Sequence, residues 1–360
     1  VHEHATWLSK FKTYDVNVLV SNEKKFHFSK QNINKESFNI VKTFQFFNLF
    51  SMPISFSYFT SFFYHIKRTD ILFLHEPWPL GTLCLFLTNL LFRREIKTII
   101  FWHADTKKLW FIDKVIYFFQ RKNLNNAKFI FVTNKLVLQN SIINNLPCLN
   151  SKLIELPIPI NISMKKSDIA KDVKEINNIV KSKSLFFFFG RLVKYKGVEV
   201  LIKSFQTIKK NKIILIAGEG PLSKLIKDSI KGYENIIFID RFLSESEKIF
   251  LFKKTTAFLF PSINEAESLG ITQIESLSLG CPVINTNIKT AVPFVSLNNI
   301  TGKTINAGDH KELSSTINHF PNKYSEDWKK LSVNCRKRYN NFFSRDKFEK
   351  KFRAILKKIN

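Results

Sequence analysis

The feature that most constrains the fold is a strand-length apolar run that leads through a short loop into a helical pattern. Ala257 to Phe260 are apolar and end at Pro261-Ser262, and apolar residues then recur at helical spacing between positions 271 and 277. The sequence therefore predicts a strand, a loop and a helix start in succession. This is the unit from which α/β domains are built.

Two carboxylates lie eight positions apart in this unit, Glu267 and Glu275. On one continuous helix they would differ by about 80° in direction, so a joint role favours Glu267 in the loop and Glu275 in the helix. The first N–H groups at the helix start, those of Leu269, Gly270 and Ile271, lack intrahelical partners and favour a phosphate or sugar oxygen. The alternative is a solvated loop acid and a surface helix residue.

A second segment suited to phosphate lies upstream, where the buried strand pattern Phe186–Phe189 runs into Gly190. Arg191 and Lys196 then stand on either side of a turn that precedes a helical pattern. Arginine offers a planar fork to phosphate oxygens, and lysine offers a point charge. Taken singly, each is equally an ordinary surface cation, because the chain has 56 Lys and Arg residues.

In order, spacing and context these motifs resemble the family 4 retaining glycosyltransferases of GT-B fold, the glycosyl transferases group 1. Gly218-Glu-Gly-Pro221, after another predicted strand, and Gly280-Cys-Pro-Val283 complete the resemblance. It implies that Arg191 and Lys196 bind the donor diphosphate, that Glu275 holds the nucleotide ribose, and that Glu267 lies beside the donor sugar as a catalytic residue. The further residues that it implies for binding the nucleotide sugar are Gly190, Gly218, Ser268, Leu269 and Gly270.

Two apolar strands of the first half end in histidines, at His75 and His103. Ligands bind outside the carboxyl ends of strands in open α/β sheets, so both are candidate site residues. Trp102-His-Ala-Asp105 is similar to the family's histidine-bearing segment at the interdomain cleft, which implies that His103 is catalytic and contacts the donor sugar or the acceptor. For His75 we expect a loop-shaping role. A purely structural histidine is the alternative at both positions.

The chain opens at Val1-His-Glu-His-Ala, without the first strand and glycine-rich loop that members of the family carry before the corresponding helix. We expect that strand and loop to be missing from this sequence. His2, Glu3 and His4 are acceptor-side candidates, and the alternative is that they are solvated residues of a helix start. They do not form a convincing metal site.

The length of 360 residues suits two domains, and alternating strand and helix patterns predict an α/β architecture. The resemblance to the GT-B glycosyltransferases implies that these are two Rossmann-like domains that face each other across a cleft. We expect an acceptor-binding domain over 1–158, a nucleotide-sugar-binding domain over 159–340, and a final helix within 341–360 that packs back on the first domain. Its expected buried stripe is Phe348, Phe352, Ile355 and Leu356.

The formal net charge of +27 attracts nucleic acid or an anionic membrane surface. Since the sequence has no recognisable nucleic-acid module, we expect no nucleic acid and favour peripheral docking on the inner face of the plasma membrane. The uncharged segments Phe44–Ile66 and Pro77–Phe92 are expected to be helices of the N-terminal domain. They are either buried against its sheet or, in the Phe-rich first segment, present an apolar face beside Lys67 and Arg68 to the lipid interface.

No metal or cofactor is expected. The cysteines lack CxxC spacing, which argues against a zinc site or a disulfide framework; they are Cys84, Cys148, Cys281 and Cys335. The sequence has no Asp-x-Asp motif, in agreement with the resemblance to a family that needs no divalent metal for catalysis.

The resemblance predicts an EC 2.4 enzyme, a bacterial hexosyltransferase that moves a sugar from a UDP- or GDP-sugar to an acceptor hydroxyl with retention. Asn285–Val295 resembles a segment of members that build surface polysaccharides, which implies a lipid-linked glycan of lipopolysaccharide or capsule as acceptor. Asp240-Arg241-Phe242 lies where the base pocket is expected. Two alternatives stay open: a GT-B sugar-nucleotide epimerase, and a non-catalytic basic protein that binds membrane or nucleic acid.

Overall fold

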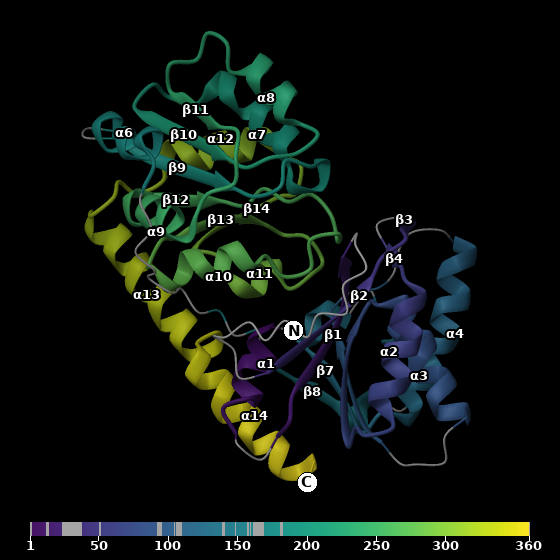
Figure 1. Cartoon of the computed structure of the whole chain (residues 1–360). Coiled ribbons are helices and arrows are strands. Elements are labelled where there is room, and N and C mark those ends of the chain that lie inside the picture. The colour runs from purple at the N-terminus through teal and green to yellow at the C-terminus, as the bar shows by residue number, and fades with distance from the viewer. Residues whose placement is uncertain are drawn as a thin grey trace. The chain divides into compact units, whose positions relative to one another are not determined.

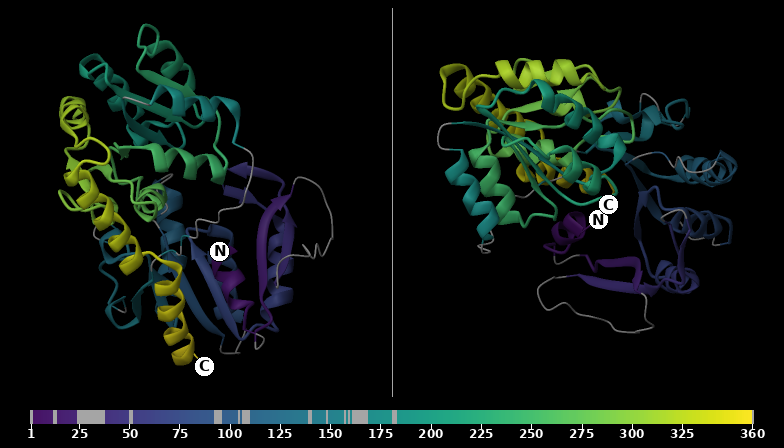
Figure 2. Two further views of the ribbon diagram at one scale, coloured as in Figure 1. Left: turned by 90° about the vertical axis from the view of Figure 1, so that its left-hand side faces the viewer. Right: turned by 90° about the horizontal axis from the view of Figure 1, so that it is seen from above.

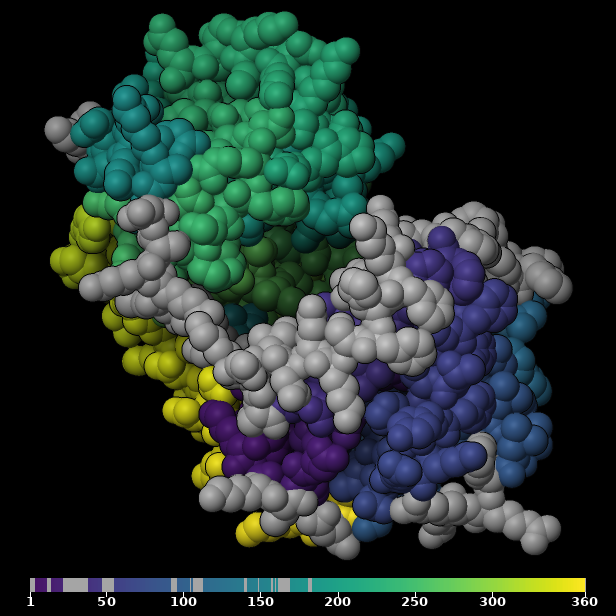
Figure 3. Space-filling model, in the orientation of Figure 1, coloured from purple at the N-terminus to yellow at the C-terminus, as the bar shows by residue number. Residues whose placement is uncertain are grey.

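The computed structural model describes residues 2–11, 14–23, 38–49, 52–91, 96–103, 105, 110–138, 141–147, 149–156, 158, 160, 169–180 and 183–359; the others are grey in Figure 1, Figure 2 and Figure 3. The chain divides into two compact units. The first comprises Val1–Pro157 and Glu349–Asn360, and the second comprises Ile158–Phe348. Of the linker expected at Pro157-Ile-Pro159, both prolines lie outside the described residues.

Six parallel strands form the sheet of the second unit (Figure 1): β9 (Ser184–Phe189), β10 (Lys212–Ala217), β11 (Ile236–Ile239), β12 (Ala257–Leu259), β13 (Val283–Thr286) and β14 (Gly302–Ile305). Their spatial order is β11-β10-β9-β12-β13-β14. From β9 the chain adds β10 and β11 on one side, and from β12 it adds β13 and β14 on the other, so the strand order switches between β9 and β12. In doubly wound sheets ligands bind outside the carboxyl ends of the strands at such a switch point.

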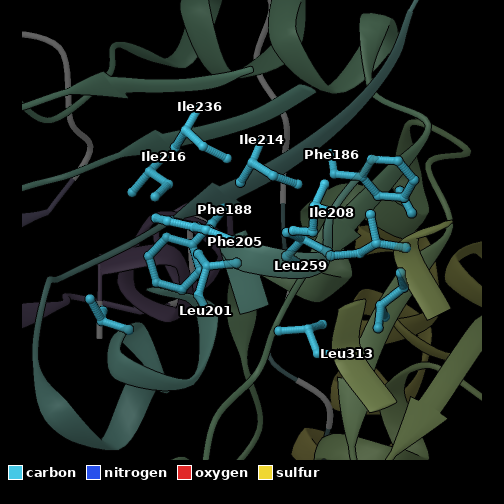
Figure 4. Close-up of a cluster of buried hydrophobic side chains, with 14 of the residues drawn as sticks. Phe186, Phe188, Leu201, Phe205, Ile208, Ile214, Ile216, Ile236, Leu259 and Leu313 are labelled. Atoms are coloured by element: carbon cyan, nitrogen blue, oxygen red, sulfur yellow. The ribbon is translucent and has the colours of Figure 1, made fainter. Parts of the chain in front are cut away.

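α6 (Lys171–Ile179) precedes the first of these strands, and α12 (His310–His319) and α13 (Glu326–Phe342) follow the last. The helices and short 3-10 turns between the strands are η2 (Lys194–Lys196), α7 (Val198–Ser204), η3 (Phe205–Thr207), α8 (Ser223–Ser229), α9 (Glu245–Lys254), α10 (Ile271–Ser278) and α11 (Val292–Val295). Successive side chains of β9 point to opposite faces of the sheet. Phe186 and Phe188 belong to the core cluster that includes Leu201 of α7 and Leu313 of α12 (Figure 4). Phe187 contacts the aromatic rings on the other side, among them Phe252 of α9 at 5.4 Å between centroids.

The first unit contains the parallel sheet β5-β6-β7-β8, formed by β5 (Ile71–Glu76), β6 (Lys97–Trp102), β7 (Phe129–Val132) and β8 (Leu153–Glu155). A separate parallel pair joins β1 (Asn17–Glu23) to β2 (Asn39–Phe44), and β3 (Phe47–Leu49) pairs antiparallel with β4 (Met52–Ile54). The helices of this unit are α1 (His2–Leu8), α2 (Phe56–Ile66), α3 (Pro79–Leu91), α4 (Trp110–Asn126), η1 (Lys135–Leu138), α5 (Leu149–Lys152) and the greater part of α14 (Arg345–Ile359).

The last helix, α14, packs within the first unit although it ends the chain (Figure 2). Its apolar stripe of Phe348, Phe352, Ile355 and Leu356 is buried, as its spacing predicts. The ring of Phe352 lies 4.9 Å from that of Trp7 in α1 and 6.1 Å from that of Phe131 in β7. Aromatic contacts therefore fasten the end of the chain to elements from its first 132 residues.

The uncharged segment Phe44–Ile66 is helical only from Phe56 onward. The prediction of a helix over its earlier part is wrong, because β3 and β4 form a hairpin there in which Asn48 pairs with Pro53. Proline lacks the N–H that a helix interior needs, and it disfavours helical geometry at the preceding residue. In the part of the chain that the structure describes, no helix is long and apolar enough to cross a membrane.

Candidate active site

The loops that follow β9 and β10 touch each other at two glycines. Gly218 has φ of 141°, and a Cβ placed there would overlap the carbonyl oxygen of Gly190. The N–H of Gly190 donates to the carbonyl of Ala217 at 3.2 Å. The close approach of the two backbones thus explains Gly218, while a contact between these glycines and a nucleotide sugar stays a prediction.

The two predicted phosphate-binding cations differ in their surroundings. Arg191 follows Gly190 and is exposed, and within the described ranges its guanidinium has no hydrogen bond or ion pair. Lys196 ends η2, and its side chain is only 16% exposed. Arg191 is therefore open to a ligand, whereas Lys196 is held inside the protein.

Lys196 forms an ion pair with Glu267, whose side chain is 10% exposed. The pair joins Nζ of the lysine to Oε2 of the glutamate, and Oγ of Ser262 donates to the same oxygen at 3.3 Å. Burial and the Glu267 carboxylate also raise the pKa of the Tyr195 hydroxyl. The structure thus brings together a cation and an acid that the sequence assigned to different parts of a donor, the diphosphate and the sugar.

Backbone contacts hold the loop after β9 against the loop after β12. Gly197 has φ of 74°, and a Cβ on it would overlap the carbonyl oxygen of Pro261. The N–H of Ile263 donates to the carbonyl of Tyr195 at 2.9 Å. These two loops leave the strands on either side of the switch point, so the Lys196–Glu267 pair lies where the topology favours a ligand.

Glu275 lies in α10, as predicted, and its partner is Lys248 of α9. Nζ of Lys248 donates to Oε1 of Glu275 at 3.1 Å, while Oε2 is buried and has no hydrogen bond within the described part of the chain. The two side chains are 10% and 15% exposed. Burial raises the pKa of Glu275, because a low-dielectric surrounding disfavours the charged form.

Lys248 was not predicted from the sequence as a site residue. Burial alone would lower its pKa, but the carboxylates of Glu275 and Glu245 outweigh burial and raise it. Nζ also lies 2.6 Å from Glu245 and 5.7 Å from the centroid of the Phe189 ring. No sequence signal could identify this lysine, since its buried partner is on another helix, 27 positions away.

A buried amide fixes the start of α10. Gly270 precedes the helix with φ of 79°, and no side chain caps it. Nε2 of Gln273 donates to the carbonyl of Leu269 at 3.1 Å, and Oε1 of the same side chain accepts from Nδ2 of Asn285 in β13 at 3.0 Å. The carbonyl of Ser268 accepts from the N–H of Ala291 at 3.0 Å. The predicted ligand-binding N–H groups at 269–271 therefore belong to an anchored backbone.

Arg241 lies in the segment where the pocket for the nucleotide base is expected, and its guanidinium is hydrogen-bonded to two acids of the protein. It donates to Glu247 at 2.8 and 3.1 Å and to Asp172 of α6 at 2.9 and 3.1 Å. The hydrogen bonds that it donates to Glu247 are the main reason that the pKa of Arg241 is raised. A cavity of about 350 Å³ adjoins it, lined by residues of α6 and β11 and by Asp240. Arg241 thus ties α6 to the start of α9.

In the first unit, His75 of β5 and His103 after β6 form a hydrogen-bonded pair. Nδ1 of His75 lies 3.0 Å from Nε2 of His103. Burial lowers the pKa of His75 to about 2 and that of His103 to about 4. His4 of α1 is 9% exposed and stacks on Phe101, so the prediction of a solvated residue is wrong there. The side chains of His2 and Glu3 lie outside what the structure describes.

Metal-binding clusters and paired cysteines do not occur in the described ranges. No group of three or more His, Cys, Asp or Glu residues is placed to hold a metal ion there. Cys84, Cys281 and Cys335 are free and buried, and Cys148 is not described.

Comparison with known proteins adds a family and a fold. Residues 170–338 match the family Glycosyl transferases group 1. The O-antigen chain mannosyltransferase C of Escherichia coli is 23% identical over 315 residues, 86% of this chain and 81% of that protein. The D-rhamnosyltransferase WbpZ of Pseudomonas aeruginosa is 23% identical over 262 residues, 71% of this chain and 65% of that protein. The crystal structure of Anabaena Alr3699/HepE in complex with UDP superposes with a TM-score of 0.74 at 12% identity, covering 96% of this chain and 100% of that one.

Proposed function

This chain is a glycosyltransferase that carries a glycosyl transferases group 1 domain in a GT-B fold, and we propose that it moves a sugar from a nucleoside diphosphate sugar to a glycan hydroxyl. The proposed donor is a UDP- or GDP-sugar, and the proposed outcome is retention at the anomeric carbon. The observation that carries this proposal is the Lys196–Glu267 ion pair between the loops that follow β9 and β12, on either side of the switch point. Arg191 lies in the first of these loops, and Glu275 lies in α10, the helix that follows the second. We call these four residues the cluster.

The charges of this cluster support binding of a diphosphate. Arg191 is exposed and has no partner in the described ranges, so its fork is available to phosphate oxygens. Lys196 can exchange its carboxylate partner for phosphate, and the uncapped start of α10 adds backbone N–H groups. Glu275 keeps one buried carboxylate oxygen without a partner among the described residues, and a ribose hydroxyl that displaced the atoms covering it would supply the missing donor.

In the proposed reaction, the bond from the anomeric carbon to the phosphate oxygen breaks and a bond from that carbon to the acceptor oxygen forms. The acceptor hydroxyl gives its proton to the departing phosphate oxygen on the same face. Arg191 and Lys196 stabilise the negative charge that grows on the leaving diphosphate, an electrostatic contribution of the kind that dominates many enzymes. Because these cations supply the charge, we propose that transfer needs no divalent metal.

The relatives favour transfer over the alternatives of an epimerase or a non-catalytic binding protein. The two relatives compared above are named as glycosyltransferases, and the similar solved structure was determined in complex with UDP. Relatives named for O-antigen chains and the solved lipopolysaccharide galactosyltransferase WaaB support an acceptor in cell-surface polysaccharide biosynthesis. A lipid-linked glycan is the acceptor that we propose.

A thermal-shift panel followed by a transfer assay tests this function. A ligand that binds only the folded state raises the melting temperature, so one nucleotide class among UDP-, GDP- and ADP-sugars should raise it. Transfer of the matching labelled sugar to a lipid-linked glycan, in EDTA, should yield a product with the donor's anomeric configuration, read by NMR. Release of an epimerised nucleotide sugar without acceptor, or no shift with any donor, contradicts the proposal.

We also propose that the enzyme works as a peripheral protein at an anionic membrane. The net charge of +27 favours such a surface. On α2, Tyr58, Phe62 and Ile66 are buried, while Phe56 and Tyr64 are 68% and 59% exposed. These two exposed rings lie near the two ends of α2, and the guanidinium carbon of the exposed Arg68, next to the exposed Lys67, lies 5.3 Å from the centroid of the Tyr64 ring.

Vesicle sedimentation tests the membrane proposal. The protein should sediment with phosphatidylglycerol vesicles and not with phosphatidylcholine vesicles, less so at high salt. The double variant Lys67→Glu with Arg68→Glu should weaken this binding. The variant Lys209→Glu with Lys210→Glu changes the net charge equally at exposed positions of the second unit. Equal loss in both variants would contradict docking through α2.

A further inference from the structure

The histidine pair of the first unit has a geometry that restricts its chemistry. Nδ1 of His75 and Nε2 of His103 are 3.0 Å apart, and the two rings are nearly parallel, with 11° between their planes. His75 is also parallel to the Phe101 ring, at 4.5 Å between centroids and 7°. A hydrogen bond thus links the two imidazoles edge to edge, and Phe101 supports the ring of His75.

A neutral imidazole carries one N–H donor and one acceptor nitrogen. Burial keeps both rings neutral at pH 7, because their pKa values lie well below that pH. If His75 donates through Nδ1, then Nε2 of His103 accepts and its Nδ1 must carry the remaining proton. If His103 donates, its Nδ1 is left as an acceptor. The tautomer of one ring therefore determines the tautomer of the other.

We propose that His75 is a positioning residue for His103: it occupies Nε2 of His103, orients the ring and couples the tautomer of His103 to its own, which leaves Nδ1 as the nitrogen of His103 available to a substrate hydroxyl. This inference rests on the proposed function and on the substrate contact that the family resemblance implies for His103, and it goes beyond both. His103 then offers one defined, uncharged hydrogen-bonding group to a sugar or acceptor hydroxyl.

The backbone holds the two histidines in this register. His75 pairs with Phe101 across β5 and β6, and the N–H of His103 donates to the carbonyl of Glu76 at 3.1 Å. The Glu76 carboxylate is 1% exposed and accepts from the N–H of Trp78, the hydroxyl of Thr82 and the amide of Gln120. Among the titratable groups close to the pair, His4 stacks on His75 at 5.4 Å.

Two amide substitutions separate the nitrogens of His75. Asparagine places an amide atom at the position of Nδ1, whereas glutamine places one near the position of Nε2. If the hydrogen bond at Nδ1 of His75 controls the tautomer of His103, His75→Asn should retain that tautomer and His75→Gln should not. His75→Phe keeps the ring that stacks on Phe101 but has no nitrogen.

NMR of protein labelled with ¹⁵N-histidine reads the tautomer directly, with the His103 signals assigned by their loss in His103→Asn. The unsubstituted protein should show one protonated and one unprotonated nitrogen on His103 from pH 7.5 to 5.5. His75→Gln and His75→Phe should show averaged nitrogens and an upward shift of the His103 pKa, and His75→Asn should stay close to the unsubstituted pattern. An unchanged His103 pattern in His75→Phe would overturn the inference.

Transfer rates provide the second readout. Loss of one hydrogen bond corresponds to roughly a tenfold fall in kcat, expected for His75→Gln and His75→Phe but not for His75→Asn. A change in the NMR pattern without any transferase activity in the unsubstituted protein would refute the proposed function and leave the positioning of His103 intact. Equal kcat losses in all three variants would show that the Nδ1 bond is not what matters.

Discussion

Nζ of Lys196 forms an ion pair with Oε2 of Glu267, so the cation proposed to bind phosphate is neutralised by an acid from the neighbouring loop. Both side chains are largely buried, and Ser262 adds a hydrogen bond to the same carboxylate oxygen. In the proposed function, a diphosphate that binds Lys196 displaces Glu267, whose carboxylate can then accept a sugar hydroxyl. The proposed function therefore predicts that phosphate binding and sugar binding are coupled.

Substitution of Glu267 should separate these two steps. Glu267→Gln frees Lys196, so the thermal shift caused by the unglycosylated nucleoside diphosphate should stay or increase, while transfer should fall about 100-fold. Lys196→Met should lose the thermal shift itself. The neighbouring exposed acid supplies the control, because Glu265→Gln should change neither quantity. A smaller shift with nucleoside diphosphate in Glu267→Gln would contradict the coupling.

Lys248→Met should weaken donor binding without removing any group that contacts the donor. Without this lysine, the pKa of Glu275, already raised by burial, rises further. A raised pKa means protonation at higher pH, so, as the pH is lowered, the thermal shift by donor should begin to fall at a higher pH in the variant than in the unsubstituted protein. Glu245→Gln removes only the exposed partner of Lys248 and should not move the profile to higher pH, because the Glu245 carboxylate itself raises the pKa of Glu275.

Gly218→Ala should destabilise the second unit by about 1–3 kcal/mol, because the added methyl group overlaps the backbone of Gly190. Gly232 is a matched control: its φ of 88° is also positive, but a Cβ there meets no atom within 4 Å. Gly232→Ala should therefore lose only about 1 kcal/mol through backbone strain. Urea unfolding of both variants measures the difference, and equal losses would show that the loop contact is unimportant.

Asn285→Leu should destabilise the start of α10. Nδ2 of Asn285 donates to Gln273, Val292 and Ser296 at 3.0 to 3.1 Å, and the residue is 1% exposed. Leaving those acceptors buried without donors costs about 1–3 kcal/mol. Urea unfolding should show this loss, and hydrogen exchange at 271–273 should accelerate. Asn287→Leu is the control, since that neighbouring asparagine is exposed.

The first unit should lose stability as the pH falls below 6.5. Burial lowers the pKa values of His4, His75 and His103 from 6.5 to about 3, 2 and 4. Between pH 6.5 and about 4 the unfolded chain therefore binds protons that the folded unit does not, which favours unfolding. Hydrogen exchange in β5 and β6 should accelerate from pH 7 to 5 after correction for the intrinsic rate. His75→Phe should reduce this dependence, whereas the exposed His319→Gln should not.

The sequence determined the local elements and the residue types of the site. The apolar run before Pro261 predicted β12, and the spacing after Gly270 predicted α10, with Glu267 in the loop and Glu275 in the helix. It also predicted the buried stripe of α14. These features depend on periodicity, glycine and proline, whose effects on the backbone act within a few residues. Where proline at position 53 was given too little weight, the prediction of a helix failed.

Only the tertiary structure decided which of these groups meet. Lys196 and Glu267 are 71 positions apart, Lys248 and Glu275 are 27 apart, and His75 and His103 are 28 apart. Each pair forms because parallel strands bring their carboxyl ends to one edge of a sheet or because two helices pack on the same face. The pKa shifts follow from burial and from these partners, which no local pattern contains. The local sequence thus determined which charged and polar residues occur in each loop and helix, and the order of the strands determined which of these residues pair in the candidate site.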